Sequence, residues 1–164
     1  MKDWVRIPEE RMKILKKNKE WIEELENLAG CKIELNEEVS IESEDPLKIL
    51  RIKEVIKAFG RGFSFKDALS LLDEDYYLEI INVKDFSGKS KNRMKTLKAR
   101  VIGSEGKAKK MIERYTNAKI AIYGKTISII GRFDEVRIAR EAIEMLLKGS
   151  LHSTVYRFLE RSRL

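Results

Sequence analysis

The sequence predicts an α+β protein built from two related units, each with the element order β-α-α-β-β-α. The first observation behind this prediction is an internal repeat. When residues 14–35 are moved forward by 87 positions, they align with residues 101–122 and their apolar positions stay in register. The second observation is that helical and strand periodicities follow one another in the same order in both halves. We therefore expect a three-stranded sheet packed against helices in each unit, with one further helix at the C-terminus.

The second unit begins with the pattern of a strand and two helices. Residues 76–81 (YYLEII) are rich in aromatic and β-branched residues, which favour a strand. Residues 90–102 form a basic helical pattern that ends at Gly103, and residues 107–115 form a second helical pattern after Gly106. The two glycines therefore mark a corner between two helices.

The second unit continues with a helix cap, a hairpin and two more helices. Asn117 closes the second helix, because asparagine tolerates the left-handed conformation of a C-cap, and Gly30 holds the equivalent place in the first unit. Residues 118–130 alternate apolar and polar side chains around a Gly-Lys turn, which predicts a hairpin. One apolar helical face runs over residues 133–149, with its cap near an aspartate, and residues 151–164 predict a short amphipathic helix.

The boundary between the two units is predicted from a glycine-rich stretch. Residues 1–62 form the first domain, residues 63–75 a connecting segment, and residues 76–164 the second domain with its helical extension. Within the connecting segment, Phe65 to Leu72 predicts a short helix rather than a flexible linker. Its apolar side chains suggest that the two units pack on one another.

Composition excludes several classes of protein. A chain of 164 residues with 43% hydrophobic and 37% charged residues suits one ordinary domain or two small ones. No stretch approaches the roughly 18 apolar residues of a membrane span, and the N-terminus lacks a signal-peptide pattern. One cysteine, Cys31, and one histidine, His152, leave no internal disulfide and no Cys/His zinc cluster. We expect an intracellular, cytoplasmic protein with no metal and no cofactor.

Charge is segregated between the two halves of the chain. Residues 1–75 contain 14 Lys and Arg against 18 Asp and Glu, a net charge of −4, whereas residues 76–164 contain 20 against 9, a net charge of +11. A small domain this basic is expected to bind polyanions, because each phosphate that it neutralises releases counterions. A solvated basic surface of the kind found in heat-stable proteins is the alternative, and it predicts interspersed rather than segregated signs.

The glycine corner has the composition of a phosphate-binding loop. Without a Cβ, Gly103 and Gly106 let another backbone approach closely, and the helix after them presents free amides and the positive end of its dipole. A phosphate is favoured there by hydrogen bonds and charge together. A plain helical corner that needs glycine for close packing is the alternative. The surrounding lysines and arginines favour the phosphate.

These residues resemble a known RNA-binding family. The stretch 101–106 (VIGSEG), followed by a helix and then by TNAKIAIYG, resembles the I-I-G-x-x-G core of the KH domain, which clamps about four nucleotides of a single strand. Together, residues 100–131 and 139–160 resemble the archaeal two-KH ribosome-assembly family, called Dim-two or partner-of-Nob in its eukaryotic relatives. The resemblance implies binding of small-subunit ribosomal RNA near its 3′ end. It also implies as partners a Nob-type endonuclease and a translation initiation factor subunit, with no membrane.

The RNA-binding residues expected from the motif and its surroundings fall into three groups. They are phosphate-contacting cations, the loop with its preceding apolar residue, and an apolar strand floor for the bases. In that order they are Arg93, Lys98, Arg100, Lys107 and Lys110; Ile102, Gly103, Ser104, Glu105 and Gly106; and Ile120 and Ile122.

The first unit departs from this pattern at its loop. Lys16 to Lys19 stand where the second unit has its two glycines, so Cβ atoms should block close backbone contact. With its net negative charge, the first unit is predicted to be a degenerate KH-like domain that serves as a protein-docking or packing platform. Trp4 and Trp21 lie in this acidic half, and we assign them to packing or to a partner surface rather than to base stacking.

The sequence motifs do not predict an enzyme. The stretch after Gly103 lacks the spacing of a P-loop, the acidic run Asp73–Asp75 predicts a solvated turn rather than a metal site, and Ser153 beside His152 predicts a helix N-cap. We therefore expect neither nuclease nor NTPase activity. Two functions remain open: an RNA-binding ribosome-assembly factor, or a module that docks an acidic translation or ribosome-assembly factor, with RNA binding secondary.

Overall fold

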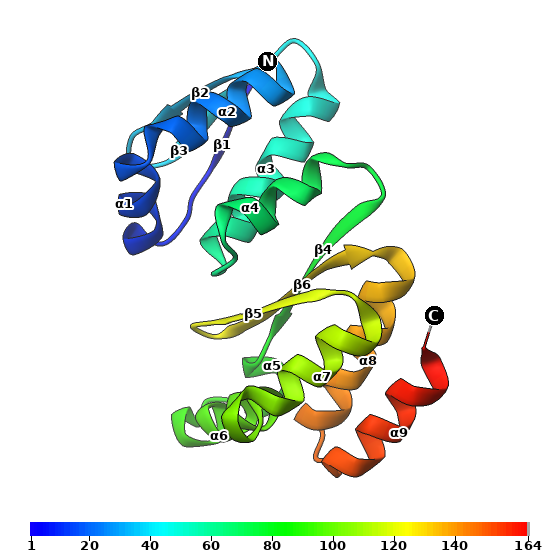
Figure 1. The fold of residues 1–164 in the computed structure, drawn as a ribbon. Helices are drawn as coiled ribbons and strands as arrows, with labels where there is room; N and C mark the ends of the chain where they lie inside the picture. The colour runs from blue at the N-terminus through cyan, green and yellow to red at the C-terminus, as the bar shows by residue number, and fades with distance from the viewer. Residues whose placement is uncertain (164) are drawn as a thin grey trace. The chain divides into compact units, whose positions relative to one another are not determined.

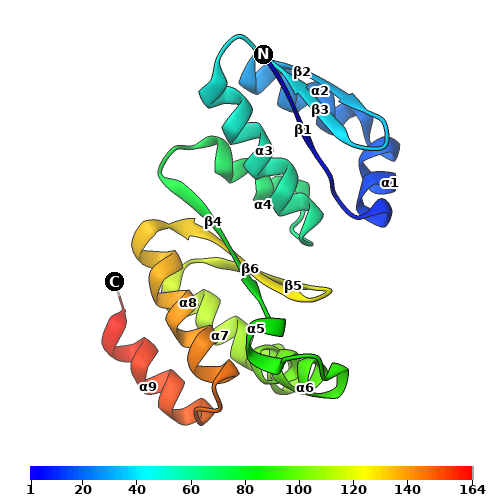
Figure 2. The same ribbon diagram turned by 180° about the vertical axis from the view of Figure 1, so that it is seen from behind.

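The computed structural model describes residues 1–163 and divides them into two compact units, residues 1–76 and residues 77 onward (Figure 1). Each unit contains one three-stranded antiparallel sheet with helices on one of its faces (Figures 1 and 2). The predicted α+β class is therefore confirmed. In the described residues no helix is long and apolar enough to cross a membrane.

The first unit carries its three strands in the spatial order β1-β3-β2, with both pairs antiparallel. Its elements are β1 (Lys2–Val5), α1 (Glu9–Lys17), α2 (Lys19–Ala29), β2 (Lys32–Leu35), β3 (Val39–Glu42), α3 (Pro46–Gly60), α4 (Phe65–Ala68) and the 3₁₀ turn η1 (Leu69–Leu72). The core side chains alternate along the strands, as a half-buried sheet requires, and Ile33 lies directly opposite Ile41.

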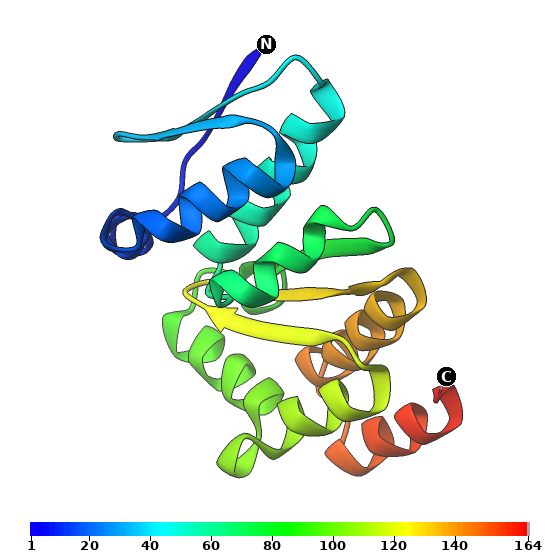
Figure 3. The ribbon, with the colours of Figure 1, turned by 45° about the horizontal axis from the view of Figure 1, so that its top comes forward.

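The second unit repeats this strand order as β4-β6-β5. Its elements are β4 (Tyr76–Asn82), α5 (Lys84–Ser87), α6 (Lys91–Ile102), the 3₁₀ turn η2 (Ser104–Gly106), α7 (Lys107–Thr116), β5 (Lys119–Tyr123), β6 (Thr126–Arg132), α8 (Phe133–Leu147) and α9 (His152–Ser162). The extra helix α9 packs along α7 and α8 (Figure 3).

The predicted elements of the second unit are confirmed, with three differences in detail. The short helix α5 was not expected, because four residues are too few to show a periodicity. Helix α8 begins after Arg132, and the Glu135 carboxylate accepts the Arg132 amide at 2.8 Å, so the cap lies at Arg132, two residues before the aspartate near which it was predicted. The prediction of Ser153 as an N-cap is wrong, because α9 begins at His152 and Leu151 precedes it without a side-chain cap.

The segment predicted to connect the units lies in the first unit. Phe65 of α4 stacks on Trp21 of α2 with ring centroids 5.2 Å apart, and Phe59 of α3 meets both rings edge-on. The apolar residues of this segment therefore close the core of the first unit.

Side-chain hydrogen bonds recur in the two units with the spacing of the sequence repeat. The Glu26 carboxylate accepts the Ile33 amide at 2.9 Å, and the Glu113 carboxylate, 87 residues later, accepts the Ile120 amide at 3.0 Å. In both units this bond ties the second helix to the strand that follows it. Both helices then end in a left-handed residue, glycine in one unit and asparagine in the other, as predicted.

Candidate nucleic-acid interface

The corner between α6 and α7 places its first glycine against the next helix. Gly103 has φ +77° and ψ 171°, a conformation that only glycine adopts readily. A Cβ at this position would lie 2.6 Å from the Ala108 amide nitrogen and 2.7 Å from the Ala108 Cβ. Gly103 is therefore required by the packing of the loop itself.

The second glycine is required for a different reason. Gly106 is left-handed, with φ +76° and ψ 12°, but the nearest atom to a Cβ built there is Lys110 Cε at 3.8 Å. Its amide donates to the Gly103 carbonyl at 3.1 Å, and Glu105 between them is also left-handed at φ +55°. The surface over Gly106 is thus open, and the constraint there is the backbone conformation.

The start of α7 presents unsatisfied donors to this open surface. No side chain caps the helix N-terminus. The Lys107 amide donates to the Ser104 carbonyl of η2, and the amides that follow Lys107 in the first turn have no acceptor within α7. The helix is 10 residues long, and its dipole adds a partial positive charge at this end. An anion over Gly106 would satisfy the amides and the dipole together.

The five predicted cations fall into two groups. Arg93, Lys107 and Lys110 are exposed. Lys98 is half-buried, and its Nζ donates to the Gly124 carbonyl in the β5–β6 turn at 2.7 Å. Of the exposed three, Lys107 and Lys110 follow the loop in α7, whereas Arg93 lies in the first turn of α6.

Arg100, the fifth cation, is held by backbone acceptors. Its Nε donates to the Leu146 carbonyl at 2.9 Å, and a terminal guanidinium nitrogen donates to the Ser150 carbonyl. Leu146 lies in the last turn of α8, and Ser150 lies in the turn that follows this helix. Arg100 therefore caps α8, and its charge is directed away from free solvent.

The first unit contains the same cap. The Arg11 Nε donates to the Phe59 carbonyl at 2.9 Å, and its terminal nitrogen donates to the Phe63 carbonyl at 2.8 Å. Both acceptors precede those of the second unit by 87 residues, the spacing of the sequence repeat. An arginine from the helix before the corner closes the last core helix in each unit.

The apolar floor differs from the expected one. Ile120 is only 4% exposed and lies in the core of the second unit. Ile122 is half-buried, and Ile102, directly before the loop, is 37% exposed. Of these three residues, Ile102 and Ile122 offer accessible apolar surface, whereas Ile120 belongs to the core.

His152 contacts the helix that precedes the glycine loop, and this contact was not predicted from the sequence. Its Nε2 lies 2.9 Å from the Arg100 carbonyl, at the end of α6. The residue 87 positions earlier is Phe65, which makes no such contact and instead stacks on Trp21. This substitution is visible when the two halves of the sequence are aligned.

Three other candidates from the sequence are a metal cluster, the acidic run Asp73–Asp75 and the thiol of Cys31. No group of His, Cys, Asp and Glu among residues 1–163 is arranged to hold a metal. In the acidic run the Asp75 amide donates to the Asp73 carboxylate at 2.9 Å, as in a local turn. Burial raises the pKa of the Cys31 thiol to about 11, so it stays protonated at neutral pH.

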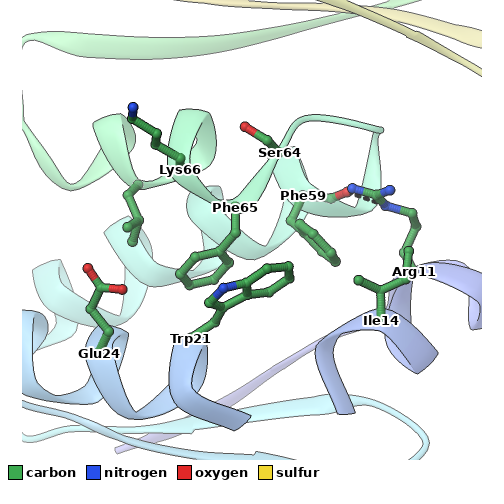
Figure 4. A pocket seen from close by; sticks show the side chains of 9 residues that line it. Arg11, Ile14, Trp21, Glu24, Phe59, Ser64, Phe65 and Lys66 are labelled. Carbon is green, nitrogen blue, oxygen red and sulfur yellow. Dashed lines mark hydrogen bonds between the residues drawn. The ribbon is translucent and has the colours of Figure 1, made fainter. Parts of the chain in front are cut away.

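The two tryptophans have different surroundings. Trp4 on β1 is 52% exposed. Trp21, stacked on Phe65, lines a cavity of about 420 Å³ in the first unit that is open to solvent (Figure 4). The Arg11 guanidinium, which also lines it, lies 4.1 Å from the centre of the Phe59 ring. Glu24 and Lys66 lie at the edge of this cavity.

The sheet order, the helix–glycine loop–helix corner and the last helix together define a KH domain. Residues 77–163 match the family described as eukaryotic-type KH domain, type I. The chain belongs to the PNO1/Dim2 family of KH-domain proteins. This confirms the resemblance inferred from the glycine motif.

Relatives of known sequence support this assignment. The chain is 37% identical over 166 residues to the KH domain-containing protein MJ0443 of Methanocaldococcus jannaschii, and the match covers 97% of this chain and 73% of that protein. It is 34% identical over 113 residues to the pre-rRNA-processing protein PNO1 of Saccharomyces cerevisiae, and the match covers 68% of this chain. The match spans only 41% of the yeast protein.

Solved structures match over nearly the whole chain. Dim2p from Pyrococcus horikoshii is 39% identical, with a TM-score of 0.86 and coverage of 98% of this chain and 99% of that one. A chain in the a/eIF2alpha–aDim2p–rRNA complex of the same organism is 38% identical, with a TM-score of 0.89 and coverage of 99% and 94%.

Proposed function

We propose that this protein is a non-catalytic ribosome-assembly factor that binds the single-stranded 3′ region of small-subunit ribosomal RNA. By family resemblance, it assists maturation of that RNA by a Nob-type endonuclease in the cytoplasm. The observation that carries the proposal is the uncapped N-terminus of α7 beside Gly106, with exposed cations on both helices of the corner. A relative of this chain crystallised with ribosomal RNA and an initiation factor subunit, which supports the choice of RNA as ligand.

In the proposed binding mode, backbone amides and side chains contact different parts of the RNA. A phosphate lies over Gly106 and accepts hydrogen bonds from the first amides of α7. Arg93, Lys107 and Lys110 neutralise neighbouring phosphates, which positions the strand without reading its sequence. The bases then lie against Ile102 and Ile122, where shape and edge contacts select among them.

The test compares one loop variant with one control in the first unit. Gly106→Asp places a carboxylate where the phosphate binds, and the left-handed conformation tolerates aspartate. Its affinity for a short RNA with the ribosomal 3′ sequence should fall more than tenfold in fluorescence anisotropy at physiological salt. Lys16→Asp with Lys19→Asp should cost much less. Unchanged affinity of the Gly106 variant would overturn the proposal, and equal losses in both variants would mean that the two units bind RNA alike.

We further propose that residues 1–62 are a degenerate KH-like domain, residues 63–75 a segment that packs on this domain and leads to the next one, and residues 76–164 the RNA-binding KH domain. The carboxylate hydrogen bonds recur at a spacing of 87 residues, and so do the carbonyls that accept from the two arginines, although the arginines themselves are 89 residues apart. Both features support a common plan. In the first unit only Asn18 separates α1 from α2, so no loop of free backbone stands before the second helix. This domain is therefore assigned no phosphate clamp.

A second candidate function, protein docking, is favoured by an exposed leucine surface on the first unit. Leu28, Leu47 and Leu50 are 61%, 70% and 55% exposed, and Leu28 and Leu47 line a hollow edged by Lys48 and Arg51. Clustered exposed leucines are typical of interaction sites, and the two cations suit an acidic partner.

The leucine surface can be tested with the purified α subunit of an archaeal initiation factor 2 as probe. Leu47→Glu should weaken binding of that subunit in calorimetry by more than tenfold and leave the affinity for RNA unchanged. Intact binding by the Leu47 variant would remove this surface from consideration.

A further inference from the structure

The contacts of Arg100 and His152 suggest a role in shaping the glycine loop. Arg100 lies in the last turn of α6, three residues before Gly103. Its side chain donates to the Leu146 carbonyl in the last turn of α8 and to the Ser150 carbonyl in the turn after it. Its own carbonyl lies 2.9 Å from Nε2 of His152, the first residue of α9. Three hydrogen bonds therefore join the end of α6 to the turn between α8 and α9.

Helix α7, on the other side of the glycine loop, also lies against α8 and α9. Helix α7 packs on both α8 and α9, and the Lys107 Nζ lies 6.0 Å from the centre of the Tyr156 ring on α9. The Tyr156 ring lies in turn 6.3 Å from the His152 ring. Residues on both sides of the glycine loop, Arg100 and Lys107, thus lie against the first turn and a half of α9.

The loop has little freedom to adjust if one of these ends moves. Gly103 already touches the backbone of α7, and a Cβ there would lie 2.6 Å from the Ala108 nitrogen. A shift of the α6 end would therefore push the loop into α7 or lift it away from the free amides. Phosphate binding by backbone amides depends on this geometry to within a few tenths of an ångström.

The first unit contains the arginine cap but not the histidine contact. It keeps the arginine cap through Arg11, but Phe65 stands at the position of His152, and the end of α1 receives no imidazole contact. The first unit also has no glycine loop. The arginine cap is therefore present in both units, whereas the histidine contact is present in the unit that has the glycine loop.

We propose that Arg100 and His152 are positioning residues for RNA binding. Their hydrogen bonds hold the end of α6 against the α8–α9 turn and so keep the glycine loop in the conformation that binds RNA. The inference rests on the proposed function. It gives the C-terminal helix a part in RNA binding and removes Arg100 from the phosphate-contacting cations.

The test replaces His152 by the residue of the first unit and by a conservative donor. His152→Phe removes the hydrogen bond to the Arg100 carbonyl, and the RNA affinity should fall about fivefold, the worth of about one hydrogen bond. The slope of log affinity against log salt should stay unchanged, because no phosphate contact is lost. His152→Gln retains a donor and should restore most of the affinity. In NMR spectra of the free protein, the Ser104 to Gly106 amides should shift in the phenylalanine variant only.

Arg100 and Arg11 form a matched pair for the same experiment. Arg100→Gln and Arg11→Gln should lower the melting temperature similarly, but only Arg100→Gln should weaken RNA binding, again at constant salt slope. A reduced salt slope in Arg100→Gln or His152→Phe would assign a direct phosphate contact and overturn the inference. Unchanged affinity in both would overturn it as well.

A double variant separates the inference from the proposed function. In a Gly106→Asp background, His152→Phe should cause no further loss, since both act through one loop. Independent, multiplicative losses would overturn the positioning role. If Gly106→Asp alone binds RNA normally, the proposed function fails, whatever the result at His152.

Discussion

The two glycines of the loop should respond very differently to the same substitution, although the motif treats them alike. Gly103→Ala forces a residue into a region that is essentially restricted to glycine and places a methyl group 2.6 Å from the Ala108 nitrogen. Backbone strain and overpacking together should cost about 3 kcal/mol or more. At Gly106 the only cost is a left-handed alanine, about 1 kcal/mol. For a unit of this size, each kcal/mol lowers the melting temperature by roughly 4–8 °C.

Thermal unfolding followed by circular dichroism measures this difference. Gly103→Ala should melt about 12 °C or more below the unmodified protein, Gly106→Ala about 4–8 °C below it, and Gly106→Asn less than that. Equal shifts at the two glycines would refute the packing argument. The result also decides which variants report on binding alone: a change at Gly103 disturbs the loop before any RNA is added, whereas a change at Gly106 acts on the binding surface.

Three further predictions concern charge, chemistry and pH. Arg93→Ala or Lys110→Ala should weaken the binding of all single-stranded RNA sequences equally and flatten the slope of log affinity against log salt by roughly 0.7. Ile122→Ala should instead change the base preference. If the cation variants changed base preference at a constant salt slope, the phosphate contacts would be assigned to the wrong residues. Highly purified protein should not cleave RNA with Mg²⁺, and cleavage that a carboxylate variant abolishes would contradict the non-catalytic role. The hydrogen bond from Lys53, 2.8 Å long, lowers the pKa of Asp3, so the stability it contributes is present above the ordinary aspartate pKa and lost as pH falls through the lowered one. Lys53→Met should move the Asp3 titration seen by NMR upward, and an unmoved titration would rule out this cause.

Local chemistry made most of the second unit predictable. Asn117 could be recognised as a left-handed cap, and the glycine corner could be placed between two helices, because each depends on residues adjacent in sequence. Contacts over a long sequence distance could not be predicted in this way. Arg100 looked like a phosphate ligand because its acceptors lie 46 and 50 residues further along the chain. Ile120 and Ile122 share one face of β5, and strand alternation does not say that the core covers the first of them more fully than the second.

The difference between the units leads to a last prediction, about restoring a loop to the first one. Replacing residues 16–19 by Gly-Ser-Glu-Gly would supply the missing glycines, but RNA binding should not appear. In the second unit Gly103 fits because the residue beneath it is the small Ala108. The repeat places Trp21 at the matching position, where its ring is fixed against Phe65. The grafted loop would therefore lack the close approach that sets its shape, in a unit whose net charge also opposes phosphate. The graft is best measured in a chain that also carries Gly106→Asp, so that any RNA affinity comes from the first unit. Micromolar binding in that chain would show that glycines alone make the clamp and that the residue beneath them is irrelevant.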